Sequence, residues 1–301
     1  MKHLFIINPV AGKGKPLKIV PEIISFLKDK KVDYSIEFTD YPGHATEIAR
    51  RYAINDKVRI YSLGGDGTIN EIINGMIGSK SSVAIIPAGS GNDLVKTLRQ
   101  GNHKDLIHRL FHGREKPIDI AAVNGRFFAN VSSFGFDAEA AKNTLLIKQN
   151  VLIPPHLCHL VGIFITMLKY RNIHLNITID GEAINTKLFL ITIANGKYYG
   201  GGIQTAPEAE VDDGLLDICL ITAKNIWQVL KTFPRYVKGQ HPGTPGVYLY
   251  KAKEVKIASD KEITLNIDGE IEKVKEVVFQ IIPNKVNVVL PYPEKIDEKA
   301  V

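Results

Sequence analysis

Residues 63–71, LGGDGTINE, and residues 87–93, PAGSGND, decide the fold of this chain. Each is a glycine-rich turn that follows an apolar run, residues 58–63 before the first turn and residues 83–86 before the second. The two turns predict junctions at which a buried strand gives way to a helix. At such a junction, backbone N–H groups of the helix N-terminus point at an anion such as a phosphate.

The helix expected after the first turn, residues 68–76, has one apolar face. Apolar residues recur there at i, i+3, i+4 and i+7, namely Ile69, Ile72, Ile73 and Met76. The two turns can also be explained without a ligand, because Thr68-x-x-Glu71 and Ser90-x-x-Asp93 are both capping-box patterns. A cap does not require the three glycines around Asp66, whose missing side chains leave room for a phosphate, so we favour phosphate binding.

The first part of the chain alternates between two periodicities. We expect strands at residues 2–7, 32–38, 58–63 and 83–86 and helices at residues 17–28, 43–52, 68–76 and 92–98. This rhythm predicts a Rossmann-like α/β nucleotide-binding domain with a parallel sheet over residues 1–123, with phosphates at the carboxyl ends of its strands. No G-x-G-x-x-G follows the first strand and no Walker A motif is present, which argues against a dinucleotide dehydrogenase and a P-loop enzyme.

From residue 116 onward, short β-rich runs replace this alternation of strands and helices. They are separated by four turn dipeptides, Asn124-Gly125, Asp180-Gly181, Asp213-Gly214 and Asp268-Gly269, which are typical of tight hairpins. We therefore expect a C-terminal antiparallel β-sandwich-like domain over residues 124–287, interrupted by helices at residues 157–170 and 225–232.

Composition sets limits on location and partners. The 301 residues are 45% hydrophobic and carry a net charge of +6. Acidic residues are nearly absent between Glu139 and Asp180 and between Lys224 and Lys256, where basic and aromatic residues alternate. Such stretches suit an anionic membrane surface or nucleic acid, and equally a solvated basic face.

The apolar stretches and the cysteines indicate a cytoplasmic protein. The apolar stretch at residues 157–168 is shorter than the roughly 20 residues that cross a bilayer, so we expect no transmembrane helix. The first residues lack a signal peptide. Cys158 and Cys219 lie in apolar runs and are expected to be small buried side chains rather than a disulfide, which fits a reducing compartment.

Five elements in order resemble the diacylglycerol-kinase-type catalytic domain of bacterial lipid kinases. They are the two glycine-rich turns, the loop IINPVAGKG at residues 6–14, the acidic turn EVDDGL at residues 210–215 and the IDGE turn at residues 267–270. Sphingosine kinases are more distantly similar, and NAD kinases share GGDG. The resemblance covers nearly the whole chain and implies that its end, residues 288–301, returns to the first domain.

The resemblance implies two cofactors and their ligands. ATP is expected to contact Asn8, Pro9, Val10, Ala11, Gly12, Thr39, Gly64, Gly65, Asp66, Gly67, Thr68, Ile69, Asn70, Glu71, Ser90 and Asn92. Mg²⁺ is expected on the acidic turn, held by the carboxylate of Asp213 and the backbone carbonyls of Glu210 and Leu215. Oxygen-only ligands are those that Mg²⁺ prefers. For an isolated Asp213-Gly214, a plain hairpin turn is the alternative.

The catalytic base is harder to assign, because Ile-Asp-Gly-Glu occurs at residues 179–182 and again at residues 267–270. Both are compatible with plain hairpin turns, and the residues alone do not choose between them. The resemblance selects the second, with Glu270 accepting the proton of the substrate hydroxyl and Asp268 orienting or assisting it.

The hypothesis for function is an ATP- and Mg²⁺-dependent lipid kinase. It transfers the γ-phosphate to a hydroxyl of a membrane lipid alcohol, with diacylglycerol as the default, and works in the cytoplasm as a peripheral protein on the inner face of the membrane. The alternatives are a soluble phosphotransferase of the NAD-kinase type and a nucleotide-binding regulator without catalysis. No nucleic-acid-binding fold is recognisable, and a homodimer is left open.

Overall fold

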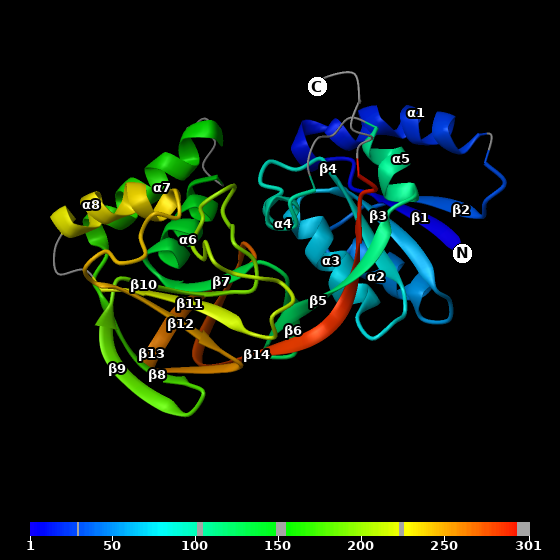
Figure 1. The fold of residues 1–301 in the computed structure, drawn as a ribbon. Coiled ribbons are helices and arrows are strands. Elements are labelled where there is room, and N and C mark those ends of the chain that lie inside the picture. The colour runs from blue at the N-terminus through cyan, green and yellow to red at the C-terminus, as the bar shows by residue number, and fades with distance from the viewer. Residues whose placement is uncertain (29, 101–104, 149–154, 223–225, 294–301) are drawn as a thin grey trace, which may run out of the picture. The chain divides into compact units, whose positions relative to one another are not determined.

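The structure is a computed structural model that describes residues 1–28, 30–100, 105–148, 155–222 and 226–293. The chain divides into two compact units, Met1–Ile118 with Asn284–Val301 and Asp119–Pro283. We call them the N-terminal and the C-terminal unit. Strands β5 (Arg114–Val123) and β14 (Glu270–Leu290) run from one unit into the other (Figure 1).

The N-terminal unit has a parallel sheet, as the alternating pattern predicts. Its remaining elements are β1 (Lys2–Ile7), η1 (Ala11–Lys13), α1 (Lys15–Leu27), β2 (Tyr34–Phe38), α2 (His44–Ala53), β3 (Val58–Gly64), α3 (Asp66–Met76), β4 (Ser82–Pro87), α4 (Asp93–Thr97) and α5 (Leu106–Phe111). The strand order is β4-β3-β1-β2, and the last residues of β14 pair in parallel with β4. Every residue of β3 and β4 is buried, as expected of central parallel strands.

The end of the chain is described only as far as residue 293. Val288 and Val289 pair with Val83 and Ala84 in the N-terminal unit. The remainder of the tail expected to return there, residues 294–301, lies outside the described residues.

The C-terminal unit is antiparallel. Its remaining elements are β6 (Arg126–Phe128), β7 (Val131–Gly135), α6 (Phe136–Lys148), α7 (Pro155–Lys169), β8 (Ile173–Ile179), β9 (Glu182–Leu188), β10 (Leu190–Ala194), β11 (Leu216–Ile221), α8 (Ile226–Val237), β12 (Val247–Ala252) and β13 (Glu254–Ile267). The main strand order is β12-β11-β10-β7-β13-β14, and the β8–β9 hairpin also pairs with β13.

Strand β10 shows how this sheet separates two cores. Ile191 and Ile193 point into the core of the sandwich, whereas Leu190 and Ala194 join the core beneath α6, α7 and α8. This alternation follows from the two-residue period of a strand. Figure 1 shows the three helices gathered on one side of the sheet. The predicted α/β plus β-sandwich-like fold is therefore confirmed.

Three of the four predicted hairpins form. Asn124, Asp180 and Asp268 have φ between 46° and 48°, and each precedes a glycine with positive φ, as two-residue hairpins require. The hairpin predicted at Asp213-Gly214 is wrong. Asp213 is absent from the left-handed region, and the dipeptide ends the long connection between β10 and β11. A DG pair alone does not specify the conformation of both of its residues.

Several helix boundaries also differ from those predicted. Helix α3 begins at Asp66 rather than Thr68, and α8 continues to Val237 rather than ending at Thr232, because Tyr236 extends its buried face. Phe164 and Leu168, on the predicted apolar face of α7, are 61% and 70% exposed. Cys158 and Cys219 are buried free thiols, as expected, and burial raises the pKa of Cys219 to about 12.

Candidate active site

The glycine-rich segments of the N-terminal unit meet at the carboxyl ends of β1, β3 and β4. The backbone N–H of Asn8 donates to the carbonyl of Leu63 at 2.9 Å, and that of Ala88 donates to Gly64 at 3.0 Å. The Asn8 side-chain amide donates to the Thr68 hydroxyl at 3.0 Å. Three segments that are distant in sequence therefore form one connected edge.

The loop after β1 lies against the second glycine-rich turn. Gly12 has φ +51°, and a Cβ there would lie 1.9 Å from the Ala88 carbonyl oxygen, so no other residue fits. Val10 is 81% exposed. Thr39 joins the same edge, because its N–H donates to the carbonyl of Ile7 at 2.9 Å. The sequence predicts that the loop after β1 and Thr39 after β2 contact the nucleotide, and the structure brings both to the same edge of the sheet.

The glycines of the two turns have different roles. A Cβ on Gly89 would lie 2.3 Å from the Cα of Gly65, so these two glycines allow the loops to pack backbone against backbone. A Cβ on Gly67, by contrast, would meet nothing within 4 Å, and the residue is exposed. At Gly67, therefore, the missing side chain leaves open space outside the protein, and internal packing does not require a glycine there.

Asp66 and Glu71 cap neighbouring helices. Oδ1 of Asp66 accepts hydrogen bonds from the backbone N–H groups of Asp93 at 2.6 Å and Leu94 at 3.4 Å, at the start of α4. Oε2 of Glu71 accepts from the N–H of Ala45 at 3.1 Å, in the first turn of α2. Burial, together with the Asp93 carboxylate, raises the pKa of Asp66.

The N-cap residue of α3 is Gly65, and among the described residues no side chain accepts the first N–H groups of this helix. The capping box Thr68-x-x-Glu71 is therefore not formed: Thr68 follows the actual N-cap, Gly65, by three positions, and Glu71 caps α2 instead. The first N–H groups of this helix lie beside the exposed Gly67, which is the arrangement that binds a phosphate.

The second turn is braced by its own asparagine. Asn92 Oδ1 accepts from the N–H of Gly89 at 3.0 Å, and its Nδ2 donates to the Gly89 carbonyl at 3.0 Å. Asn92, and not Ser90, is the N-cap residue of α4, so the alternative capping box Ser90-x-x-Asp93 is also wrong. Ser90 is exposed beside these groups.

In the C-terminal unit the two IDGE turns have nearly the same backbone. Asp268 and Asp180 both have φ 46°, and each carboxylate accepts backbone N–H groups of a neighbouring segment. Asp268 receives those of Ala129, Asn130 and Val131 at 2.9 to 3.4 Å. Asp268 thus holds the turn in place.

Arg126 distinguishes the two turns. Its guanidinium pairs with the carboxylates of Glu270 and Glu272, one through each terminal nitrogen. Among the residues described, Glu182 makes no ion pair. Sequence reasoning missed Arg126, because an arginine after an Asn-Gly turn carries no signal of its own. Its contact with Glu270 depends on the pairing of strands far apart in the chain.

The acidic turn is held by residues that the sequence did not indicate. Asp213 Oδ1 accepts from the N–H of Leu215 at 3.0 Å, and its Oδ2 accepts from the Lys251 ammonium at 2.6 Å. Buried Asp119 accepts from the N–H of Gly214 at 2.7 Å. Lys251 also lies 3.5 Å from Asp217, whose pKa burial raises to about 6.

The comparisons with known proteins agree with this arrangement. Residues 2–123 match the diacylglycerol kinase catalytic domain, and residues 130–290 match the YegS C-terminal NAD kinase beta sandwich-like domain. The chain belongs to the bacterial family of diacylglycerol-kinase-type lipid kinases. It is therefore a lipid kinase, and the family implies that it uses ATP.

Two relatives and one solved structure show the extent of the similarity. The diacylglycerol kinase of Bacillus subtilis is 27% identical over 305 residues, which cover 97% of each chain. The structure of a putative diacylglycerol kinase from Bacillus anthracis has a TM-score of 0.77 and 25% identity, covering 97% of this kinase and 95% of that chain. The diacylglycerol kinase of Staphylococcus carnosus is 26% identical over 268 residues, covering 88% of this kinase and 87% of its own chain.

The acidic turn of this kinase offers oxygen donors that suit Mg²⁺, namely the Asp213 carboxylate and the carbonyls of Glu210 and Leu215. The donor chemistry fits, although Lys251 already supplies a positive charge to Asp213. Within the described ranges, no three His, Cys, Asp or Glu side chains form a metal-binding group. The metal role of this turn, like the nucleotide and base roles, stays a prediction.

Proposed function

We propose that this kinase transfers the γ-phosphate of ATP, with Mg²⁺, to the free hydroxyl of diacylglycerol at the inner surface of the cytoplasmic membrane. The observation that carries the nucleotide part is the uncapped N-terminus of α3, where Gly67 leaves open space while Asp66 and Glu71 are used to cap other helices. Helix N-terminal N–H groups and the helix dipole favour a phosphate there. The relatives named diacylglycerol kinase support the choice of lipid.

Glu270 is the proposed general base. It accepts the hydroxyl proton while the hydroxyl oxygen bonds to the γ-phosphorus and the bond to ADP breaks. Arg126 keeps the Glu270 carboxylate in one direction, and Asp268 anchors the turn. Mg²⁺ accompanying ATP would neutralise the charge that develops on the phosphates, whereas an ion held by Asp213 and the carbonyls of Glu210 and Leu215 would order the acidic turn.

Helix length is consistent with peripheral membrane contact. In the part of the chain that the structure describes, no helix is long and apolar enough to cross a bilayer. Access to a lipid alcohol therefore requires contact with a membrane surface or with dispersed lipid.

The test is phosphate transfer from labelled ATP to a panel of acceptors: a short-chain diacylglycerol in nonionic detergent, sphingosine, extracted lipids and NAD. Labelled phosphatidic acid with Mg²⁺, and none with excess chelator, is the expected result. Labelled NADP would favour the soluble phosphotransferase, and tight ATP binding without turnover on any acceptor would favour a regulator.

A further inference from the structure

Helix α8 presents an outer surface that is exposed in the part of the C-terminal unit that the structure describes. Its residues Val229, Thr232 and Tyr236 are buried against the sheet. On its other side Trp227 and Leu230 are 71% and 46% exposed. Exposing large apolar side chains to water is unfavourable in free energy. Their exposure on α8 is therefore the first indication of a docking surface.

Phe233 extends this exposed stripe of α8. It is 37% exposed and follows Trp227 and Leu230 at intervals of three residues, so the three side chains lie along one side of the helix.

Basic side chains run beside the apolar stripe. Lys231, Arg235 and Lys238 are exposed and recur at i, i+4 and i+7. Residues 225–253 contain no Asp or Glu. A helix whose outer side combines tryptophan, leucine and phenylalanine with lysine and arginine is typical of the interface between water and an anionic bilayer.

Helix α7 adds residues of the same two kinds. Phe164 and Leu168 are 61% and 70% exposed, and Lys169 and Arg171 are exposed at its end. Residues 140–179 contain no Asp or Glu. Helices α7 and α8 thus lie in two acid-poor stretches that are separate in the sequence.

The same hydrophobic core holds both helices. Ile163 and Met167 of α7 pack against the core that contains Val229 and Tyr236 of α8. The two helices therefore form one layer on one side of the sheet (Figure 1).

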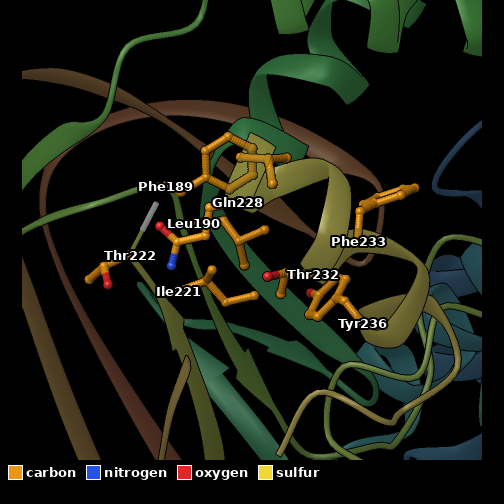
Figure 2. A pocket seen from close by; sticks show the side chains of 9 residues that line it. Phe189, Leu190, Ile221, Thr222, Gln228, Thr232, Phe233 and Tyr236 are labelled. Atoms are coloured by element: carbon orange, nitrogen blue, oxygen red, sulfur yellow. The ribbon is translucent and has the colours of Figure 1, made fainter. Parts of the chain in front are cut away.

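The space beneath α8 is too small to receive a lipid chain. Figure 2 shows the pocket lined by Leu190 and Ile221 of the sheet, by Phe189 between β9 and β10, and by Thr232 and Tyr236 of the helix. The pocket is partly open to solvent, and its cavity volume of about 20 Å³ holds about one water molecule. Phe233 lines the edge of this pocket, and it also belongs to the exposed stripe of α8.

We propose that the exposed side of α7 and α8, with Trp227, Leu230, Phe233, Phe164 and Leu168 among lysines and arginines, docks on an anionic lipid bilayer. This inference rests on the proposed function, since a kinase for a membrane alcohol must reach the bilayer. Charge decides the occupant: two helices from stretches with exposed cations and no Asp or Glu complement anionic head groups, and their apolar side chains reach the acyl boundary.

Trp227 is the single tryptophan of the chain and lies on the proposed surface, so its fluorescence reports docking directly. Vesicles of phosphatidylglycerol and phosphatidylcholine in equal parts, without diacylglycerol and without ATP, should shift its emission to shorter wavelength. Brominated acyl chains should quench it. Vesicles of phosphatidylcholine alone should do neither at low salt.

Two variants keep the reporter. Lys231→Gln with Arg235→Gln should weaken vesicle partitioning about 30-fold, and Leu230→Gln about tenfold. The matched control is Lys261→Gln with Lys275→Gln, which removes the same charge from exposed positions on β13 and β14 and should leave partitioning close to that of the parent.

The outcomes separate this inference from the proposed function. No emission shift on anionic vesicles, in a parent that phosphorylates short-chain diacylglycerol in detergent, overturns the docking surface. An emission shift that depends on protein concentration without vesicles, together with a dimer in sedimentation, also overturns it in favour of a second copy. A shift on anionic vesicles that the 231/235 variant loses supports the surface even if no lipid is phosphorylated.

Discussion

The carboxylate of Asp66 accepts the backbone N–H of Asp93 at 2.6 Å, so the first glycine-rich turn caps the helix that follows the second. A capped helix N-terminus no longer offers its first N–H groups to a ligand. The acid at the centre of GGDG therefore connects the two loops, and the N–H groups that we propose bind phosphate are those at the start of α3, where no described side chain caps the helix.

Gly67→Val should lower ATP affinity at least tenfold with little change in melting temperature, because its side chain would occupy open space where we place a phosphate. Calorimetric titration and thermal melting measure the two effects. Gly89→Ala is the contrasting variant and should lower the melting temperature, since its Cβ would meet the Gly65 backbone. Unchanged ATP affinity in Gly67→Val would exclude the α3 N-terminus as the phosphate site.

Glu270→Gln should lower the catalytic rate by about 10² to 10⁴ with ATP affinity unchanged, because the amide cannot accept the hydroxyl proton. Glu182→Gln is an internal control, since it makes the same change in a turn of the same backbone form. Steady-state lipid phosphorylation measures both. A loss confined to Glu182→Gln would transfer the base to the first IDGE turn.

Arg126→Met should lower kcat by about 10- to 100-fold and leave KM for ATP unchanged, since Glu270 loses the cation that orients it. Arg126→Lys should recover part of the rate, because it restores the charge without the two-pronged geometry. Lys256→Met, which breaks the exposed pair with Glu254, serves as the control. Equal kcat in Arg126→Met and the parent would show that Arg126 does not position the base.

Lys251→Met should make the melting temperature of the nucleotide-free protein more sensitive to Mg²⁺, because it frees Asp213 Oδ2 for a metal ion. Adding Asp213→Asn to this variant should remove the effect, and Lys253→Met should behave as the parent. A Mg²⁺ response that survives Asp213→Asn would place the ion elsewhere.

Asp137→Asn should stabilise the protein at pH 8 and have little effect near pH 4. Burial raises the pKa of Asp137 to about 6, whereas in the unfolded chain it ionises near its ordinary value of 3.8. Because the folded state holds the proton more tightly, stability falls as pH rises from about 4 to 6, by at most about 3 kcal/mol. Urea unfolding at several pH values measures this, and a pH-independent difference between the two proteins would contradict it.

Much of the fold was predictable because it depends on local periodicity. The buried runs of β3 and β4, the apolar face of α3 and three of the four turn dipeptides lie where the sequence places them. The failures are instructive. Thr68-x-x-Glu71 has the spacing of a cap, yet Glu71 bonds to α2, and spacing within one helix cannot foresee a partner on another.

The sequence by itself determined the two-domain fold class and predicted phosphate binding at the glycine-rich turns, since both depend on residue types a few positions apart. Tertiary structure alone decided which glycine faces open space, which IDGE turn has an arginine, and that Lys251 lies beside Asp213. It also decided that two acid-poor stretches supply one helical layer. The physical reason is that these contacts join residues brought together by strand pairing and helix packing, and no local pattern in the chain encodes them.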